Sequence, residues 1–108
     1  MANPYAGEVR LMLDGVPRTL KLTLGALVEL ETTLGADSLV GLVQRFESAE
    51  YSSRDVLALV VAGLRGGGWS GEAQDLLTVE IEGGPVAAAQ AAALLLARAF
   101  TVPGGVPA

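Results

Sequence analysis

Cysteine and histidine are absent from this 108-residue sequence, and lysine occurs once, at Lys21. Without cysteine the chain has no disulfide, no thiolate zinc site and no cysteine nucleophile. Without histidine it lacks the commonest general base near neutral pH and the commonest ligand for transition metals. Catalysis would have to rely on carboxylates, hydroxyls and a few basic side chains. The sequence therefore predicts no enzyme, no catalytic residue, no metal site and no cofactor.

Positive charge is also scarce, with 7 basic residues against 12 acidic ones and a net charge of -5. Nucleic-acid binders need a basic face to displace counterions from phosphates, and anionic membranes attract basic segments. Neither kind of partner is expected. The longest apolar run, 86–97, is interrupted by Gln90 and is shorter than the roughly 20 residues of a membrane span. Residues 1–7 lack the basic start and apolar stretch of a signal peptide, so nothing suggests secretion.

Alternating polar and apolar residues mark the start of the chain. The alternation runs over 8–14 and again over 18–22, with Asp14-Gly15 between the two segments. Alternation on both sides of an Asp-Gly pair predicts a β-hairpin, here over residues 8–22. Pro17 cannot donate to a ladder, so it belongs at the turn or on an edge.

The hydroxyl of Thr23 can cap a helix. Leucines at helical spacing continue this predicted helix to Leu34, and Gly35 is expected to end it. Asp37 or Ser38 opens a second helix with an apolar stripe that ends at Phe46.

Ser52 and Asp55 have the spacing of a capping box, and the third helix that they predict ends at the glycines 66–68. Ser70 is then expected to cap a short fourth helix. Residues 78–82 fit either a frayed helical end or a short strand.

The last helix is predicted from Val86 to about Phe100, with Pro85 suited to its first turn. The segment 101–108, rich in glycine and proline, is expected to be a flexible tail. Residues 1–100 are thus predicted to form one mainly α (α+β) domain, in which an N-terminal hairpin is followed by four to five short helices.

Two groups of residues could suggest a catalytic or phosphate-binding site. The carboxylate pairs Glu29 with Glu31 and Glu80 with Glu82 have no positioned partner in the sequence, so we interpret them as solvated surface. The glycines between 63 and 71 lack the lysine and hydroxyl of a phosphate loop and any dinucleotide-binding spacing. They are better explained as a helix stop and a link.

Partner binding has more support. The last helix is apolar almost all round, broken only by Gln90 and Arg98, and such a helix must be covered on several sides. Either the other helices bury it, or part of it forms an interface for self-association or another protein. Trp69 is either a core residue that closes a helix corner or an anchor for a partner, and Tyr51 is open to both interpretations. Trp69, Tyr51 and Arg98 are the candidate partner contacts.

With these elements in order, the chain resembles the tail assembly chaperones of long-tailed phages, in particular those of gene transfer agents, which are phage-like particles that package host DNA. The similarity covers nearly all of the chain except the tail. It lies in apolar and glycine positions rather than in a catalytic signature, in the segments 7–10, 22–31, 34–35, 53–64, 66–69 and 92–100.

The resemblance implies a small α-rich fold without enzymatic activity. It also implies binding to the tape measure protein, whose long apolar surface must stay soluble in the bacterial cytoplasm until tube subunits polymerise around it. Other tail proteins are further expected partners. Because proteins of this group are also labelled tail tube or minor tail proteins, the alternative is a structural component of the tail, such as a tube or connector subunit.

Overall fold

The computed structural model describes residues 7–34 and 39–100. Strands β1 (Glu8–Leu13) and β2 (Val16–Lys21) form a two-stranded antiparallel sheet in which Val9 faces Leu20. The two residues between the strands, Asp14 and Gly15, have φ angles of 51° and 76°. A two-residue hairpin turn of the primed type needs positive φ at both central positions, so the predicted hairpin is confirmed.

Within the described residues, four α-helices and one 3-10 turn follow the hairpin. They are α1 (Leu24–Leu34), α2 (Leu39–Glu47), α3 (Ser53–Gly66), η2 (Ala73–Leu76) and α4 (Gly84–Ala99). The predicted class, mainly α with an N-terminal hairpin, is confirmed. The predicted tail 101–108, the stop at Gly35 and the caps at Asp37 or Ser38 lie outside the described residues.

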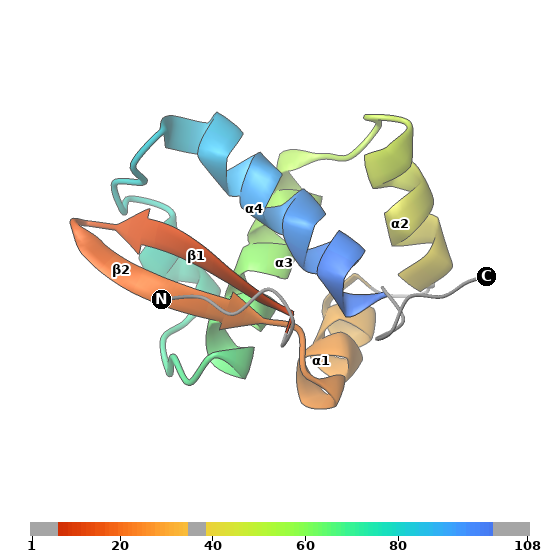
Figure 1. Ribbon diagram of the computed structural model, residues 1–108, viewed down its shortest axis with the longest axis horizontal. Helices are drawn as coiled ribbons and strands as arrows, with labels where there is room; N and C mark the ends of the chain where they lie inside the picture. Colours follow the sequence, from red (N-terminus) through yellow and green to blue (C-terminus); the bar gives the residue numbers. More distant parts are fainter. Residues whose placement is uncertain (1–6, 35–38, 101–108) are drawn as a thin grey trace.

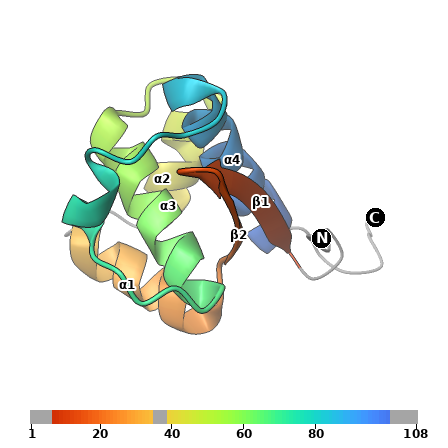
Figure 2. The same ribbon diagram turned by 90° about the vertical axis from the view of Figure 1, so that its left-hand side faces the viewer.

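Helix α3 is the centre of the fold, because it packs against β2, α1 and α4. The hairpin lies against α3 and α4, α1 lies at the base of the molecule, and α2 stands at the far side from the hairpin turn (Figures 1 and 2). Aliphatic side chains from all these elements form the core. Its largest fully buried members are Leu20, Leu30, Leu42, Leu59, Leu64 and Leu95.

Helices α1 and α3 are capped by the residues that the sequence predicts. The hydroxyl of Thr23 accepts the backbone N–H of Ala26 at 3.1 Å. At the start of α3, the Ser52 hydroxyl accepts the Asp55 N–H at 3.1 Å, and the Asp55 carboxylate accepts the Ser52 N–H at 3.0 Å. Both predicted helix starts are confirmed, since each cap involves residues only three positions apart.

Glycines at the end of α3 allow its backbone to touch β2. A Cβ at Gly66 would lie 1.9 Å from the Lys21 carbonyl oxygen, and one at Gly67 would lie 1.9 Å from that of Thr19. The glycine run therefore ends the helix, as predicted, and also permits a close backbone approach that the sequence pattern does not reveal.

The prediction that Ser70 caps a fourth helix is wrong. Element η2 is a single four-residue 3-10 turn that starts after Glu72, whose N–H donates to the Asp75 carboxylate at 2.8 Å. The nearer acidic pair supplies the cap, so the hydroxyl at Ser70 is not used for it.

Residues 78–82 form neither of the two predicted elements: the segment is not helical, and it makes one isolated bridge to β1 instead of a strand. Ile81 forms an isolated antiparallel bridge with Leu13, and the Glu82 N–H donates to the Met12 carbonyl at 3.1 Å. The segment lies along the outer edge of β1, where the Arg98 guanidinium also donates to the Glu8 carbonyl. The outer edge of β2 carries Pro17, which has no N–H, and contacts the end of α3. Both sheet edges are therefore largely covered.

Candidate protein-binding groove

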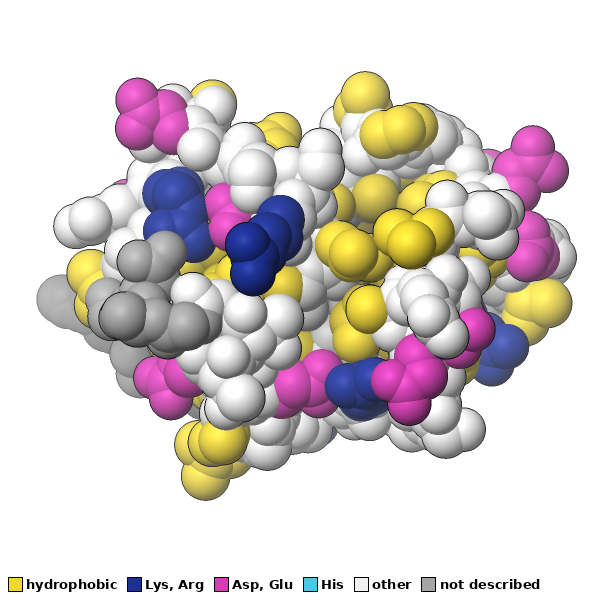
Figure 3. Space-filling view, turned by 180° about the vertical axis from the view of Figure 1, so that it is seen from behind, with side chains coloured by type: hydrophobic (Ala, Val, Ile, Leu, Met, Phe, Trp, Pro, Cys, Tyr) yellow, Lys and Arg dark blue, Asp and Glu magenta, His cyan; other side chains and the backbone are white. Residues whose placement is uncertain are grey.

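An open apolar groove lies between α3 and α4. Its volume is about 760 Å³, and α3 contributes one wall and the N-terminal half of α4 the other. Figure 3 shows hydrophobic side chains gathered in a hollow on this face of the molecule. The lining residues are Phe46, Tyr51, Ser53, Val56, Leu57, Val60, Leu76, Ile81, Pro85, Val86, Ala88, Ala89, Gln90 and Ala93.

Small residues on α4 leave this hollow open. Ala88 is buried against the core, while Ala89 is half-buried and Ala93 exposed along the groove. Val60 of α3 is buried beneath them. Because alanine carries only a methyl group, α4 covers α3 without filling the space above Val56, and apolar surface remains open to a partner.

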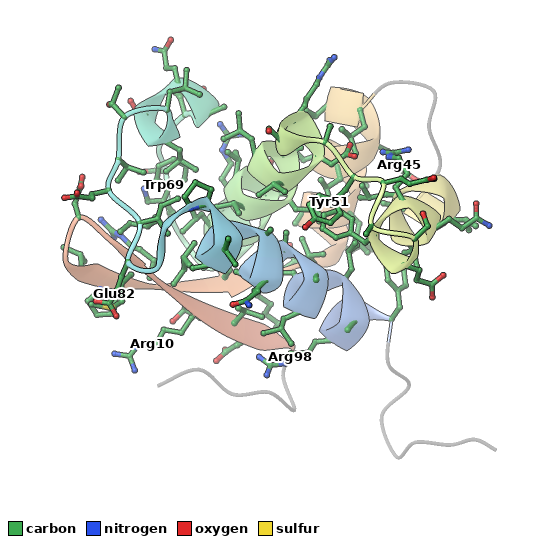
Figure 4. All side chains as sticks on the ribbon, turned by 90° about the horizontal axis from the view of Figure 1, so that it is seen from above. Arg10, Arg45, Tyr51, Trp69, Glu82 and Arg98 are labelled. Carbon is green, nitrogen blue, oxygen red and sulfur yellow. The ribbon has the colours of Figure 1, made fainter. Side chains whose placement is uncertain are left out.

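Two stacked aromatic rings close one end of the groove. The ring centroids of Phe46 and Tyr51 are 4.4 Å apart, and their planes differ by 7°. Phe46 belongs to α2, and Tyr51 comes from the loop between α2 and α3 (Figure 4). Stacked rings gain stability beyond the area that they bury, so this wall is preformed.

An ion pair fixes the loop that carries Tyr51. The guanidinium of Arg45 donates to both oxygens of Asp55, at 2.9 and 3.0 Å. Burial alone would raise the pKa of Asp55. The opposing effects of Arg45 and of the N–H and hydroxyl of Ser52 outweigh it, and the pKa lies below its ordinary value. The charged carboxylate therefore holds α2, the loop and the start of α3 together.

The surroundings of the groove carry charge of both signs. Arg54 and Glu50 are exposed close to Tyr51 in the chain, and Asp75 and Glu82 are exposed next to Leu76 and Ile81. Figure 3 shows Lys or Arg side chains and Asp or Glu side chains on both sides of the hollow. Apolar surface, rather than net charge, therefore distinguishes the groove.

The three residues predicted as partner contacts are not brought together. Tyr51 lines the groove, whereas Trp69 and Arg98 do not. Trp69 is half-buried against the core, with its ring lying on Gly71, and Arg98 ties α4 to the Glu8 carbonyl of β1. Figure 4 shows the three side chains on different parts of the molecule.

Most of the residues that line the groove were not among the contacts predicted from the sequence. Val56, Leu57, Ala89 and Ala93 line it, but each is an ordinary member of an apolar helix. The one available signal was the surplus of apolar residues around the last helix, which does contribute a wall.

The residues that line the groove give little support to a catalytic function. Its polar lining is limited to Ser53, Gln90 and the Tyr51 hydroxyl, with no carboxylate or basic side chain. Across 7–34 and 39–100, no three Asp or Glu residues cluster in a way that could hold a metal ion. None of the helices in those ranges is long and apolar enough to cross a membrane. The arrangement suits the binding of an apolar protein surface.

Comparison with known protein families gives one match over nearly the whole chain. A family model described as "Phage tail tube protein, GTA-gp10" matches residues 6–102. Searches of curated proteins and of solved structures gave no match. The matched range contains the hairpin, all four α-helices and the complete lining of the groove.

Proposed function

This chain belongs to the phage tail tube protein family GTA-gp10, and on that premise we propose that it is a structural subunit of a phage-like tail of the gene transfer agent type. The observation that carries the proposal is the family match, because it extends across every described element. The chain is accordingly a phage or gene transfer agent tail protein, and its partners are other tail proteins.

A non-enzymatic role is part of the proposal. General acid–base catalysis needs a titratable group held within hydrogen-bond reach of a substrate. The groove instead offers aliphatic and aromatic side chains with one phenol. Asp55, the one buried charged residue among those that the structure describes, is engaged by Arg45 and Ser52 in holding a loop. Its shifted pKa therefore has a structural explanation.

A tail assembly chaperone that binds the tape measure protein is the second candidate function. A holdase for a long helical client needs an apolar groove between helices, and the groove between α3 and α4 fits that need. The small sheet also favours this candidate. Tube subunits normally join sheets around a ring, whereas here two strands have largely covered edges.

Particle composition separates the two functions. We expect quantitative mass spectrometry of gradient-purified particles to find this chain in many copies per tail, in fixed ratio to the other tail proteins. Its absence from intact tails would reject the structural role. In that case, co-expression should show whether the tape measure protein loses solubility without this chain, as the chaperone function requires.

A matched pair of variants tests the groove in the same particles. Ala93→Glu places a charge in the groove at an exposed position, and Val40→Glu places one on α2, where the valine is exposed outside the groove. Tail incorporation should fall with Ala93→Glu and persist with Val40→Glu. Equal incorporation of both variants would show that the groove is not used.

A further inference from the structure

Helix α2 is the α-helix that buries the fewest side chains in the described part of the chain. Leu42 is its one buried residue, whereas α3 buries every residue from Ala58 to Leu64. Its backbone packs chiefly along α1, while α3 packs against β2, α1 and α4. Figure 1 shows α2 at the edge of the molecule. Segments with few buried apolar side chains open at a lower free-energy cost than the core.

Two capping motifs divide the connection between α2 and α3 into two parts. The Glu50 N–H donates to the Arg45 carbonyl at 2.7 Å, and Ala49 has a φ angle of 59°. This is the pattern of a left-handed helix cap, so the chain up to residue 50 belongs to the end of α2. The capping box that begins at Ser52 belongs to α3. Tyr51 lies between the two caps, and a hinge consists of a few such residues that absorb a change in backbone angles.

Two side-chain contacts cross this hinge and hold α2 in place. Arg45 donates to both carboxylate oxygens of Asp55, at 2.9 and 3.0 Å, and the ring of Phe46 stacks on that of Tyr51. The ion pair joins α2 directly to α3. Because Phe46 and Tyr51 also line the groove, any movement of α2 displaces the aromatic end of the groove.

We propose that α2 is a hinged wall of the groove, which turns about Tyr51 away from α3 and is held closed by the ion pair of Arg45 with Asp55. In the open form the groove is wider at its aromatic end and accepts a bulkier apolar partner. Leu42 leaves the core in this movement, which keeps the open form a minor population in the free chain. A partner that binds the open form better shifts the population toward it.

Thiol labelling measures the opening in the purified full-length chain, which has no cysteine. Leu42→Cys places a thiol beneath α2, and Leu59→Cys places one in α3. Both leucines are 0% exposed, so each thiol reacts only when its site opens. With folding verified by circular dichroism, the α2 thiol should react at least about tenfold faster than the α3 thiol, because the latter requires the core to unfold.

Two substitutions that each remove an arginine ion pair separate local opening from unfolding of the core. Arg45→Met breaks the pair that is lost in the open form, so labelling of the α2 thiol should rise by about fivefold. Arg65→Met removes the pairs of α3 with Glu29 and Glu72, which stay intact when α2 alone turns. It should speed labelling of the α3 thiol by about fivefold and leave the α2 thiol unchanged.

Equal labelling of the two thiols would overturn the proposal, because α2 would then open only together with the core. So would an α2 thiol that Arg65→Met speeds as much as the α3 thiol. An α2 thiol that Arg45→Met leaves unchanged would overturn the role of the ion pair. Each of these results leaves the tail role intact, since that role is decided by particle composition.

A second readout joins the movement to the width of the groove. Val56 of α3 lines the groove and is half-buried, so Val56→Cys places a thiol within it. A bulky maleimide dye that enters only the open form should react about fivefold faster when Arg45→Met is added, in proportion to the open population. A small thiol reagent should change little. An equal change for both reagents would contradict a movement that widens the groove.

Discussion

Replacing Gly66 with alanine should destabilise the protein, against the usual effect of that change in a helix. Ordinarily alanine gains up to about 1 kcal/mol over glycine in a helix interior. Here the added Cβ would stand 1.9 Å from the Lys21 carbonyl oxygen of β2. An acceptable carbon–oxygen contact is about 3.3 Å or longer, so α3 and the hairpin would have to separate by more than about 1 Å.

The size of the effect follows from that displacement. Forcing extra volume into a packed region costs about 1–3 kcal/mol, occasionally more, and here the obstructing atom is backbone rather than the end of a flexible side chain. We expect a net loss of about 2 kcal/mol in the free energy of unfolding. For a domain of this size that lowers the melting temperature by roughly 8–16 °C.

A matched substitution provides the control. Gly25 lies in α1, where an added Cβ would meet nothing closer than the Thr23 hydroxyl at 3.9 Å. Gly25→Ala should therefore stabilise the protein by about 0.5 kcal/mol. Urea unfolding monitored by the fluorescence of Trp69, the only tryptophan, measures both variants. If Gly66→Ala equals or exceeds the wild type in stability, the close contact between α3 and β2 is not as described.

Three further predictions concern side chains near the groove and the core. Asp55→Asn should cost about 1–3 kcal/mol at neutral pH by weakening the bond to Arg45. Because the pKa of Asp55 is lowered in the folded state, the carboxylate contributes fully above about pH 4 and loses its effect as the pH falls through the folded value. The difference from the wild type should shrink in acid, and a constant difference would contradict this. Arg65→Met removes the ion pairs to Glu29 and Glu72, at 2.7 and 3.3 Å, and the hydrogen bonds to the Gly71 carbonyl. Since Arg65 is partly exposed, the loss should be about 1 kcal/mol in urea unfolding, and an unchanged stability would mean that this set of contacts does not stabilise the fold. Tyr51→Ala should lower the incorporation of the chain into purified tails, because Tyr51 lines the groove, while circular dichroism shows the chain folded; unchanged incorporation would exclude Tyr51 as a contact.

Local interactions made much of this fold predictable. The turn at Asp14-Gly15, the cap at Thr23 and the capping box of Ser52 with Asp55 each depend on residues within a few positions of one another. The sequence spacing therefore contains the whole interaction. The failed cap at Ser70 is also local, because two residues with capping ability, Ser70 and Glu72, compete over a short stretch and the choice depends on packing.

Long-range contacts were beyond sequence reasoning. The bridge between Leu13 and Ile81 joins positions 68 apart, so alternation near Ile81 suggested a strand without naming its partner. The pair of Arg45 with Asp55 spans a loop, and neither residue is unusual by type. The groove depends on how α4 crosses α3, which periodicity does not determine. Of the three candidate contact residues, only Tyr51 lines the groove.

A thiol placed in the groove tests directly whether another tail protein covers it, because the chain has no cysteine of its own. Chains with Ala93→Cys in the groove or Val40→Cys outside it would be incorporated into tails, and the purified tails would be treated with a thiol-specific reagent. We expect Ala93→Cys to react in the free chain and to be protected in tails, with Val40→Cys reacting in both. Tails that contain the chain but leave Ala93→Cys as reactive as in the free chain would contradict partner binding in the groove.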